Sequence, residues 1–313
     1  MAPEMSDLQK TGSQGEERRF EAYGLSISSM IDLPELKPGL LNRQPDLSIV
    51  EGPVRGDEVN AREHGAGFWI GETDFVFNVS GVARYRVQNG RKITFEPAPG
   101  AHEDSVRLFL LGTALGAVLM QRGFLVLHGN AIRIGDGCLI CLGPSGAGKS
   151  TLAAGFMQRG YELLADDVVA VNEDGAALPG IPRIKLWQDT ASNLAIDTAD
   201  LHRIQPGYEK FNVPVEASFA HRATPVRWAY LLEPSEDAAF RIERITGMAK
   251  YPPLFGNTYR AGLIDGMGLR AAHLEQCGRL ASRITLSRVV RPKLGFDLDG
   301  LIQRLLDDIA TTG

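Results

Sequence analysis

Cysteine is scarce in this sequence, occurring three times in 313 residues. So few thiols cannot build the disulfide framework that staples many small secreted domains. Nothing at the start of the chain resembles a secretory signal, so we predict a reducing, cytoplasmic location. Cys138 and Cys141 form a C-x-x-C pair, but positions i and i+3 of a strand face opposite sides. We therefore interpret them as core residues and not as a redox or metal pair.

Long hydrophobic runs and an excess of positive charge are also missing. The longest apolar run covers residues 108–120, which is 13 residues, whereas a helix that spans a bilayer needs about 20. We predict that this run belongs to a buried helix over residues 102–121, and we expect no membrane partner. The formal net charge is −5, so there is no basic field to attract nucleic acid, and we expect no such partner.

One strong motif stands out, Gly143-Pro-Ser-Gly-Ala-Gly-Lys-Ser150, with Thr151 directly behind it. It fits the phosphate-binding pattern G-x-x-x-x-G-K-[ST]. The short apolar segment 138–142 before it predicts a buried parallel strand. Residues 151–159 have apolar side chains at helical spacing, and Gly160 stands where a helix would end. A strand, a glycine loop and a helix in this order form the structure in which this pattern binds phosphate.

Each residue type in the loop has a chemical reason. The glycines permit positive φ and close backbone approach, so that successive amides converge on phosphate oxygens at the positive end of the new helix. Lys149 can reach the β- and γ-phosphates, and Ser150 can ligate Mg²⁺. We predict a nucleoside triphosphate site with ATP and Mg²⁺ as cofactors, formed by Gly143, Pro144, Ser145, Gly146, Ala147, Gly148, Lys149, Ser150 and Thr151.

Two adjacent carboxylates, Asp166 and Asp167, interrupt an apolar strand predicted over residues 161–171. They lie 16 and 17 residues beyond Ser150, a gap that one helix and a tight turn would fill. The next strand would then return them to the sheet edge that carries the phosphate loop, in a βαβ crossover. Neighbouring strand residues point to opposite faces, so both can face the site only if the strand bulges or ends there. One Asp could help to hold Mg²⁺ while the other accepts a proton from an attacking hydroxyl.

The sequence lacks the marker motifs of two classes of nucleotide-hydrolysing protein. The Leu-Ser-Gly-Gly-Gln sequence of ABC-type ATPases is missing, and so is the Asn-Lys-x-Asp of Ras-like GTPases. The nearest segment to the latter, Asn193-Leu-Ala-Ile-Asp197, has no lysine. A kinase is the class that remains.

The rest of the chain divides into three parts. Residues 1–19 are polar and predict a disordered tail. Residues 20–122 form a β-rich module with a connecting helix, in which Asn89-Gly90 gives a clear hairpin signal. Residues 123–313 form the phosphate-loop domain. Within it, we expect residues 205–214 to contain a turn and residues 248–286 to be largely helical.

Three segments together resemble the HPr kinase/phosphorylase family. They are Leu127-His128-Gly129, the glycine loop from Gly143 to Ser150, and Gly160-Tyr-x-Leu-Leu-Ala-Asp166-Asp167. The resemblance covers roughly residues 124–175. It implies an α/β fold with a phosphate-loop kinase core of the HPr kinase and phosphoenolpyruvate carboxykinase type, preceded by the β-rich module.

The resemblance also implies roles for individual residues. Asp166 would be the catalytic base, Lys149 and His128 would act at the transferred phosphate, and Asp167 would bind Mg²⁺ together with Ser150. Residues 178–187 depart from the family's signature segment, so neither phosphorolysis nor HPr as substrate is implied. The β-rich first part looks more like the HPr kinase-like proteins of ribosomally made peptide clusters, which include lasso-peptide kinases. The implied activity is a serine kinase acting on a precursor peptide.

Four cations are candidates to neutralise developing charge or to hold a substrate carboxylate: Arg183, Lys185, Lys210 and Arg260. Arg183 and Lys210 are preferred because both are predicted to lie in loops after the catalytic strands. Several alternatives stay open: a small-molecule kinase, an HPr kinase proper, or a nucleotide-dependent regulator without catalysis. Whether the chain forms a homo-oligomer is also left open.

Overall fold

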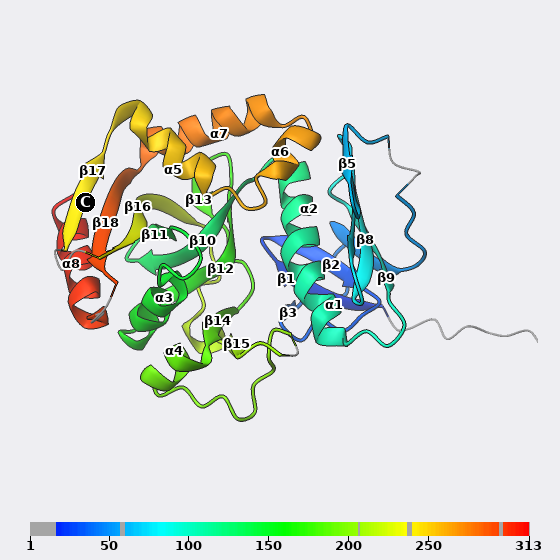
Figure 1. The fold of residues 1–313 in the computed structure, drawn as a ribbon, viewed down its shortest axis with the longest axis horizontal. Helices are drawn as coiled ribbons and strands as arrows, with labels where there is room; N and C mark the ends of the chain where they lie inside the picture. Colours follow the sequence, from blue (N-terminus) through cyan, green and yellow to red (C-terminus); the bar gives the residue numbers. More distant parts are fainter. Residues whose placement is uncertain (1–16, 57–59, 206, 237–239, 294–296, 313) are drawn as a thin grey trace, which may run out of the picture.

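A computed structural model describes residues 17–56, 60–205, 207–236, 240–293 and 297–312. The fold is mixed α/β and contains two large sheets (Figure 1). One sheet is built from the first hundred residues, and the other carries the glycine loop. The predicted tail over residues 1–19 lies mostly outside the described residues. Its last part was predicted wrongly, because Arg18 and Arg19 begin the first strand.

The N-terminal sheet is mixed, with the order β3-β1-β2-β4-β9-β8-β7-β6-β5 in the described part. The Asn89-Gly90 turn joins β8 to β9 as predicted, and both residues have positive φ, 53° and 62°. Such angles suit the tight turns whose twist matches paired strands. The strands are β1 (Arg18–Ala22), β2 (Leu25–Ser29), β3 (Lys37–Pro38), β4 (Leu47–Glu51), β5 (Glu63–Gly65), β6 (Phe68–Ile70), β7 (Asp74–Val79), β8 (Ala83–Gln88) and β9 (Lys92–Pro97).

A long helix stands between the two sheets (Figure 1). It consists of α1 (Glu103–Phe109), a π-helical turn (Leu110–Ala114) and α2 (Leu115–Gln121). The side chain of His102 caps its first turn. Residues 110–120 are buried throughout, which explains the apolar run in the sequence. The helix was predicted correctly, apart from its π-helical turn.

The second sheet positions the glycine loop. Its strands run in the order β12-β10-β11-β16-β18-β17, with the short β13 bridging β12 and β16. Because β10 is antiparallel to both β11 and β12, those two are parallel, and α3 connects them as the predicted crossover. The strands are β10 (Leu125–Ile134), β11 (Gly137–Leu142), β12 (Glu162–Val171), β13 (Ala176–Ala177), β16 (Thr224–Ser235), β17 (Arg241–Ile245) and β18 (Thr285–Pro292).

A separate hairpin of β14 (Arg183–Trp187) and β15 (Lys210–Pro214) lies beside this sheet. The remaining helices are α3 (Lys149–Gln158), α4 (Gln188–Asn193), α5 (Tyr251–Gly256), α6 (Gly262–Gly266), α7 (Arg270–Arg283) and α8 (Leu298–Ala310). Short 3₁₀ turns cover Glu216–Ser218 and Gly247–Lys250.

Residues 205–214 contain the predicted turn, in which the Tyr208 amide donates to the Gln205 carbonyl oxygen at 3.2 Å. Residues 210–214 then form strand β15, antiparallel to β14. One boundary in this half was predicted wrongly. Residues 285 and 286 open β18 and do not continue a helix. Parallel pairing of β18 with β16 joins segments about 57 residues apart in the chain, and local sequence carries no signal for such a contact.

The hydrophobic core is continuous across the two halves of the chain. One cluster of buried side chains joins the N-terminal sheet and the long helix to Val126 of β10 and Val168 of β12. Tyr23 adds a hydrogen bond from its hydroxyl to the Val168 carbonyl oxygen at 3.0 Å. The N-terminal module therefore supports the strands that carry the predicted site. Cys138 and Cys141 lie in two different core clusters on opposite faces of β11, as predicted, and burial raises the pKa of Cys141 to about 12.

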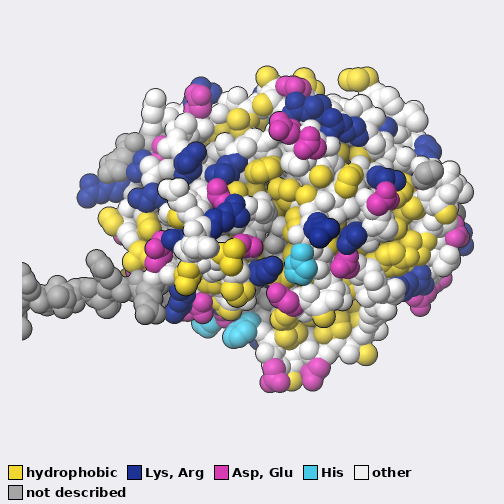
Figure 2. Space-filling view, turned by 180° about the vertical axis from the view of Figure 1, so that it is seen from behind, with side chains coloured by type: hydrophobic (Ala, Val, Ile, Leu, Met, Phe, Trp, Pro, Cys, Tyr) yellow, Lys and Arg dark blue, Asp and Glu magenta, His cyan; other side chains and the backbone are white. Residues whose placement is uncertain are grey.

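Lys, Arg, Asp and Glu side chains are interspersed over the face shown in Figure 2. Among the described residues, no helix is both long enough and apolar enough to cross a bilayer.

Gly129 marks the tightest backbone approach in the site strands. A β-carbon at this position would lie 2.4 Å from the carbonyl oxygen of Cys141 on the paired strand β11, and backbone atoms there cannot move aside. We expect Gly129→Ala to lower the free energy of unfolding by about 2 kcal/mol or more, measured by chemical denaturation.

The matched control is Gly278→Ala in the middle of α7, where a β-carbon would meet nothing within 4 Å. This change should be neutral or slightly stabilising, because alanine favours helix. Equal stability of the two variants would contradict the close approach of β10 and β11.

Candidate active site

The glycine loop between β11 and α3 has the backbone of an anion cradle. Gly143, Gly146 and Gly148 all have positive φ, at 136°, 80° and 89°. A β-carbon on Gly143 would lie 2.7 Å from the carbonyl oxygen of Leu232, so this position excludes larger residues. Helix α3 begins at Lys149, and the free amides of its first turn make the loop suited to phosphate.

Lys149 is buried beneath the loop. Its Nζ donates to the carbonyl oxygens of Gly143 at 2.7 Å and Pro144 at 3.0 Å. Burial lowers the pKa of Lys149, and the attraction of Asp167 and Asp166 opposes this only in part. The ammonium group is thus held at the loop by two weak acceptors, which a phosphate oxygen could replace.

Two residues that the sequence analysis missed fix the loop in place. Asn257 accepts a hydrogen bond from the Gly143 amide at 2.9 Å through its side-chain oxygen, and its backbone oxygen accepts from the His128 amide at 2.7 Å. Arg291 of β18 donates to the carbonyl oxygen of Ala147 at 2.7 Å. Both come from segments more than a hundred residues after the loop, and no local motif marks them.

Asp166 is held by three donors. Its Oδ1 accepts from the Ser150 hydroxyl at 3.2 Å and from the side-chain amide of Asn130, and its Oδ2 accepts from the Lys185 backbone amide at 2.8 Å. Burial, and then the neighbouring charge of Asp167, raises the pKa of Asp166. Asn130 was also missed; a polar residue in the apolar strand 125–132 is the signal that could have found it.

Asp167 faces the same site because its backbone leaves the strand conformation. Its φ is 74°, in the left-handed region that Asp tolerates better than most residues. This angle is the irregularity that the sequence required if adjacent carboxylates were to share a face. Asp167 Oδ2 lies 2.6 Å from Lys185 Nζ, and its Oδ1 lies 3.3 Å from His128 Nδ1. Burial opposes ionisation of Asp167, but Lys185 and His128 outweigh it and hold its pKa well below the usual range.

Two cavities meet at these residues. The first, of about 190 Å³, is bordered by the glycine loop, Asn130, both carboxylates, Lys185 and Lys210. The second, of about 410 Å³, is lined by Gly143, Pro144 and residues 256–260. His128 and Asp167 line both cavities, whereas Asp166 lines only the first. Asp167 therefore stands between the cavity of the glycine loop and the second cavity.

The structure brings together most of the predicted site residues. His128, Lys149, Ser150, Asp166, Asp167 and Lys210 all border the first cavity, along with much of the glycine loop. The hydroxyl of Ser150 donates to Asp166, while the shared role of Ser150 and Asp167 at Mg²⁺ stays a prediction. Lys210 lies at the start of strand β15 and not in a loop.

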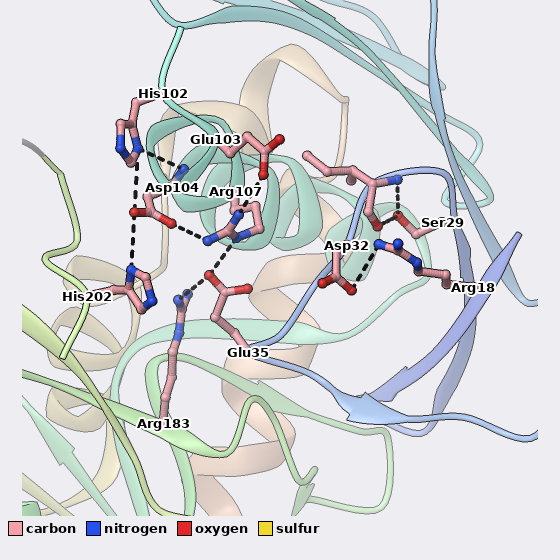
Figure 3. A network of polar contacts seen from close by, with 11 residues as sticks. Arg18, Ser29, Asp32, Glu35, His102, Glu103, Asp104, Arg107, Arg183 and His202 are labelled. Carbon is pink, nitrogen blue, oxygen red and sulfur yellow. Dashed lines mark hydrogen bonds and ion pairs between the residues drawn. The ribbon is translucent and has the colours of Figure 1, made fainter. Parts of the chain in front are cut away.

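Arg183 was predicted wrongly as a loop cation facing the substrate. It begins strand β14 and turns away toward the N-terminal module, with its Nη1 3.8 Å from Glu35 Oε1 (Figure 3). Glu35 also pairs with Arg107 of α1 at 3.0 Å, and Arg107 in turn contacts Asp104. Arg183 therefore links the two halves of the chain and does not reach the cavity. Lys185, two residues later in the chain, is the cation that contacts Asp167 in the site.

No protein-family model matches the sequence, and no curated protein matches it. Among solved structures, the fold is similar to the Hpr(Ser) kinase/phosphatase from Coxiella burnetii, with a TM-score of 0.33 and 14% sequence identity. The similarity covers 59% of this chain and 90% of that chain. It is a partial match of the fold.

The contact between Lys185 and Asp167 has a consequence for stability. Since the pKa of Asp167 is lowered in the folded protein, its ionised form stabilises the fold above the unfolded pKa, and this is lost as the pH falls through the lowered value. We expect Lys185→Met to cost about 2 kcal/mol at pH 7, less than for a fully buried pair because the Asp167 side chain is 26% exposed.

In that variant burial would raise the pKa of Asp167, so protonation would relieve the cost and the stability difference should shrink towards pH 4. Urea denaturation at both pH values measures this. Lys185→Met combined with Asp167→Asn should recover much of the loss at pH 7. A cost that is independent of pH, and not recovered in the double variant, would contradict the assigned ion pair.

Proposed function

We propose that this chain is an ATP-dependent kinase that transfers the γ-phosphoryl group to the serine hydroxyl of a peptide. The observation that carries the proposal is the position of Asp167, which lines both the cavity of the glycine loop and the neighbouring cavity. Phosphoryl transfer needs a carboxylate at this boundary to orient the acceptor hydroxyl and take its proton.

The residues around Ser150 fit a magnesium ion. The Ser150 hydroxyl and Asp166 Oδ1 converge at 3.2 Å, and Asn130 Oδ1 is buried without a hydrogen-bond partner among the described residues. Hydroxyl, carboxylate and amide oxygens are hard ligands of the kind Mg²⁺ prefers, and phosphate oxygens usually complete its shell. When bound, the ion would neutralise charge on the transferred phosphate. We therefore assign the metal to Ser150 and Asp166, in place of Ser150 and Asp167.

The remaining side chains of the site have separate roles at the phosphate. Lys149 can exchange the loop carbonyls for phosphate oxygens. Lys185, now paired with Asp167, lies in the same cavity and can stabilise negative charge on the transferred group. Asp167 stays ionised because of its lowered pKa, and His128 at 3.3 Å orients it. Asp167 takes the acceptor proton in this scheme, a role that the family resemblance gave to Asp166.

The second cavity is the proposed acceptor site. Arg260 lines it and also lines a third, open and apolar cavity of about 480 Å³ whose walls include Phe68, Phe75 and Phe77 of the N-terminal sheet. An acceptor that reaches from Asp167 past Arg260 would thus meet the N-terminal module. This extent supports a peptide over a small metabolite, and the resemblance to lasso-peptide kinases suggests a precursor peptide.

Only the first part of the segment that departs from the HPr kinase signature, residues 178–182, packs away from the site, whereas Lys185, Leu186 and Trp187 at its end line the first cavity. The carbonyl oxygen of Pro179 accepts from the Tyr23 amide at 2.8 Å, and a β-carbon on Gly180 would lie 3.0 Å from the Tyr23 ring. The first part of the segment therefore packs against the N-terminal module, and its end carries Lys185 to the two carboxylates.

The roles of the two carboxylates can be separated by conservative substitution. Asp167→Asn should reduce phosphoryl transfer by about 10²-fold or more while Mg-ATP affinity changes little. Asp166→Asn should instead raise the Mg²⁺ concentration needed for half-maximal nucleotide binding and transfer. Calorimetric ATP titrations at several Mg²⁺ concentrations, paired with transfer assays, measure both. If Asp166→Asn abolished transfer at unchanged Mg²⁺ dependence, the roles would be those first predicted from the resemblance.

The acceptor class is tested by incubating the protein with Mg-ATP and a pool of serine-containing peptides, beside a pool of hydroxylated metabolites. Mass spectrometry should find the added mass of one phosphoryl group on serine in the peptide pool. Product in the metabolite pool alone would overturn the peptide assignment. Tight ATP binding without product in either pool would favour a non-catalytic regulator.

A further inference from the structure

Trp187 is an exposed aromatic side chain at the edge of the proposed nucleotide cavity. Half of its surface, 50%, is open to solvent, whereas Trp228 is 5% exposed in the core. Trp187 lines the cavity together with Thr151 and Thr190. A large aromatic ring left open beside a phosphate cradle is unusual, because burial would remove more apolar surface from water.

The strand that carries Trp187 fixes its direction. Along β14, Ile184 and Leu186 pack into the core, and residues two apart in a strand share a face. Trp187 therefore shares a face with Lys185, whose backbone and side chain bind Asp166 and Asp167. The same strand thus places a cation at the catalytic carboxylates and an aromatic ring farther along the cavity.

The ring of Trp187 contacts a lysine on the partner strand, and the helix that follows Trp187 contacts α3. Trp187 pairs with Lys210 in the register of β14 and β15, and Lys210 Nζ lies 5.6 Å from the ring centre. The hydroxyls of Thr151 in α3 and Thr190 in α4 lie 3.4 Å apart. Since α4 begins directly after Trp187, this contact joins the segment that carries Trp187 to the first turn of α3.

We propose that Trp187 stacks on the base of the bound purine nucleotide through the ring face that Lys210 does not cover. This rests on the proposed nucleotide site and adds the element that recognises the base. The cavity of about 190 Å³ encloses the phosphates, and the base then lies at its mouth against the exposed ring. Because every base has a π-face, stacking discriminates weakly between bases, so GTP binds in the same way as ATP.

The test compares ATP, GTP and inorganic tripolyphosphate, which has the phosphates but no base. In Trp187→Leu, the Kd for ATP and for GTP should rise by about 5- to 150-fold, the equivalent of about 1–3 kcal/mol of stacking. The Kd for tripolyphosphate should change less than twofold. Trp187→Phe keeps an aromatic face and should recover much of the nucleotide affinity. Calorimetry at constant Mg²⁺ gives all of these values.

A spectroscopic readout accompanies the titrations. ATP should quench tryptophan fluorescence of the parent protein more than tripolyphosphate does, and this difference should vanish in Trp187→Phe. Unchanged ATP affinity in Trp187→Leu would overturn the stacking. Equal losses for ATP and tripolyphosphate would assign Trp187 a structural role. Failure of the parent protein to bind either ligand would overturn the proposed function as well, which distinguishes the two failures.

Discussion

The site depends on one residue that touches both carboxylates. The backbone amide of Lys185 donates to Asp166, and its ammonium group donates to Asp167. Two adjacent half-buried carboxylates repel each other, and without a nearby cation this repulsion favours protonation of one of them. Lys185 removes much of that cost for Asp167 while Asp166 keeps a raised pKa. The two carboxylates therefore differ: the pKa of Asp167 is lowered and that of Asp166 is raised.

The same strand explains why the two halves of the chain form one structure. Arg183, at the start of β14, pairs with Glu35 of the N-terminal module, and Lys185 reaches the site two residues later. The hydrophobic core that joins the N-terminal sheet to β10 and β12 also supports these two strands. The N-terminal module is thus a structural part of the site, and its apolar cavity shares Arg260 with the second cavity of the site.

Strain at Asp167 is consistent with this arrangement. A positive φ on a residue other than glycine costs roughly 1 kcal/mol or more, and it persists only where the surroundings fix it. The contacts of Asp167 with Lys185 and His128 provide that fixation. A regular strand would have turned the two carboxylates to opposite faces of the sheet.

Local sequence determined the glycine loop, the helix after it, the crossover to the double aspartate and the Asn89-Gly90 hairpin, because each depends on residues close together in the chain. It also required an irregularity at Asp166-Asp167, from strand geometry alone. Only the tertiary structure decided which aspartate meets Ser150, that Lys185 and not Arg183 reaches the site, and that Asn130, Asn257 and Arg291 support it. The sequence analysis likewise did not predict strand β18. These features arise from contacts between distant segments, and periodicity and propensity within a segment contain no information about them.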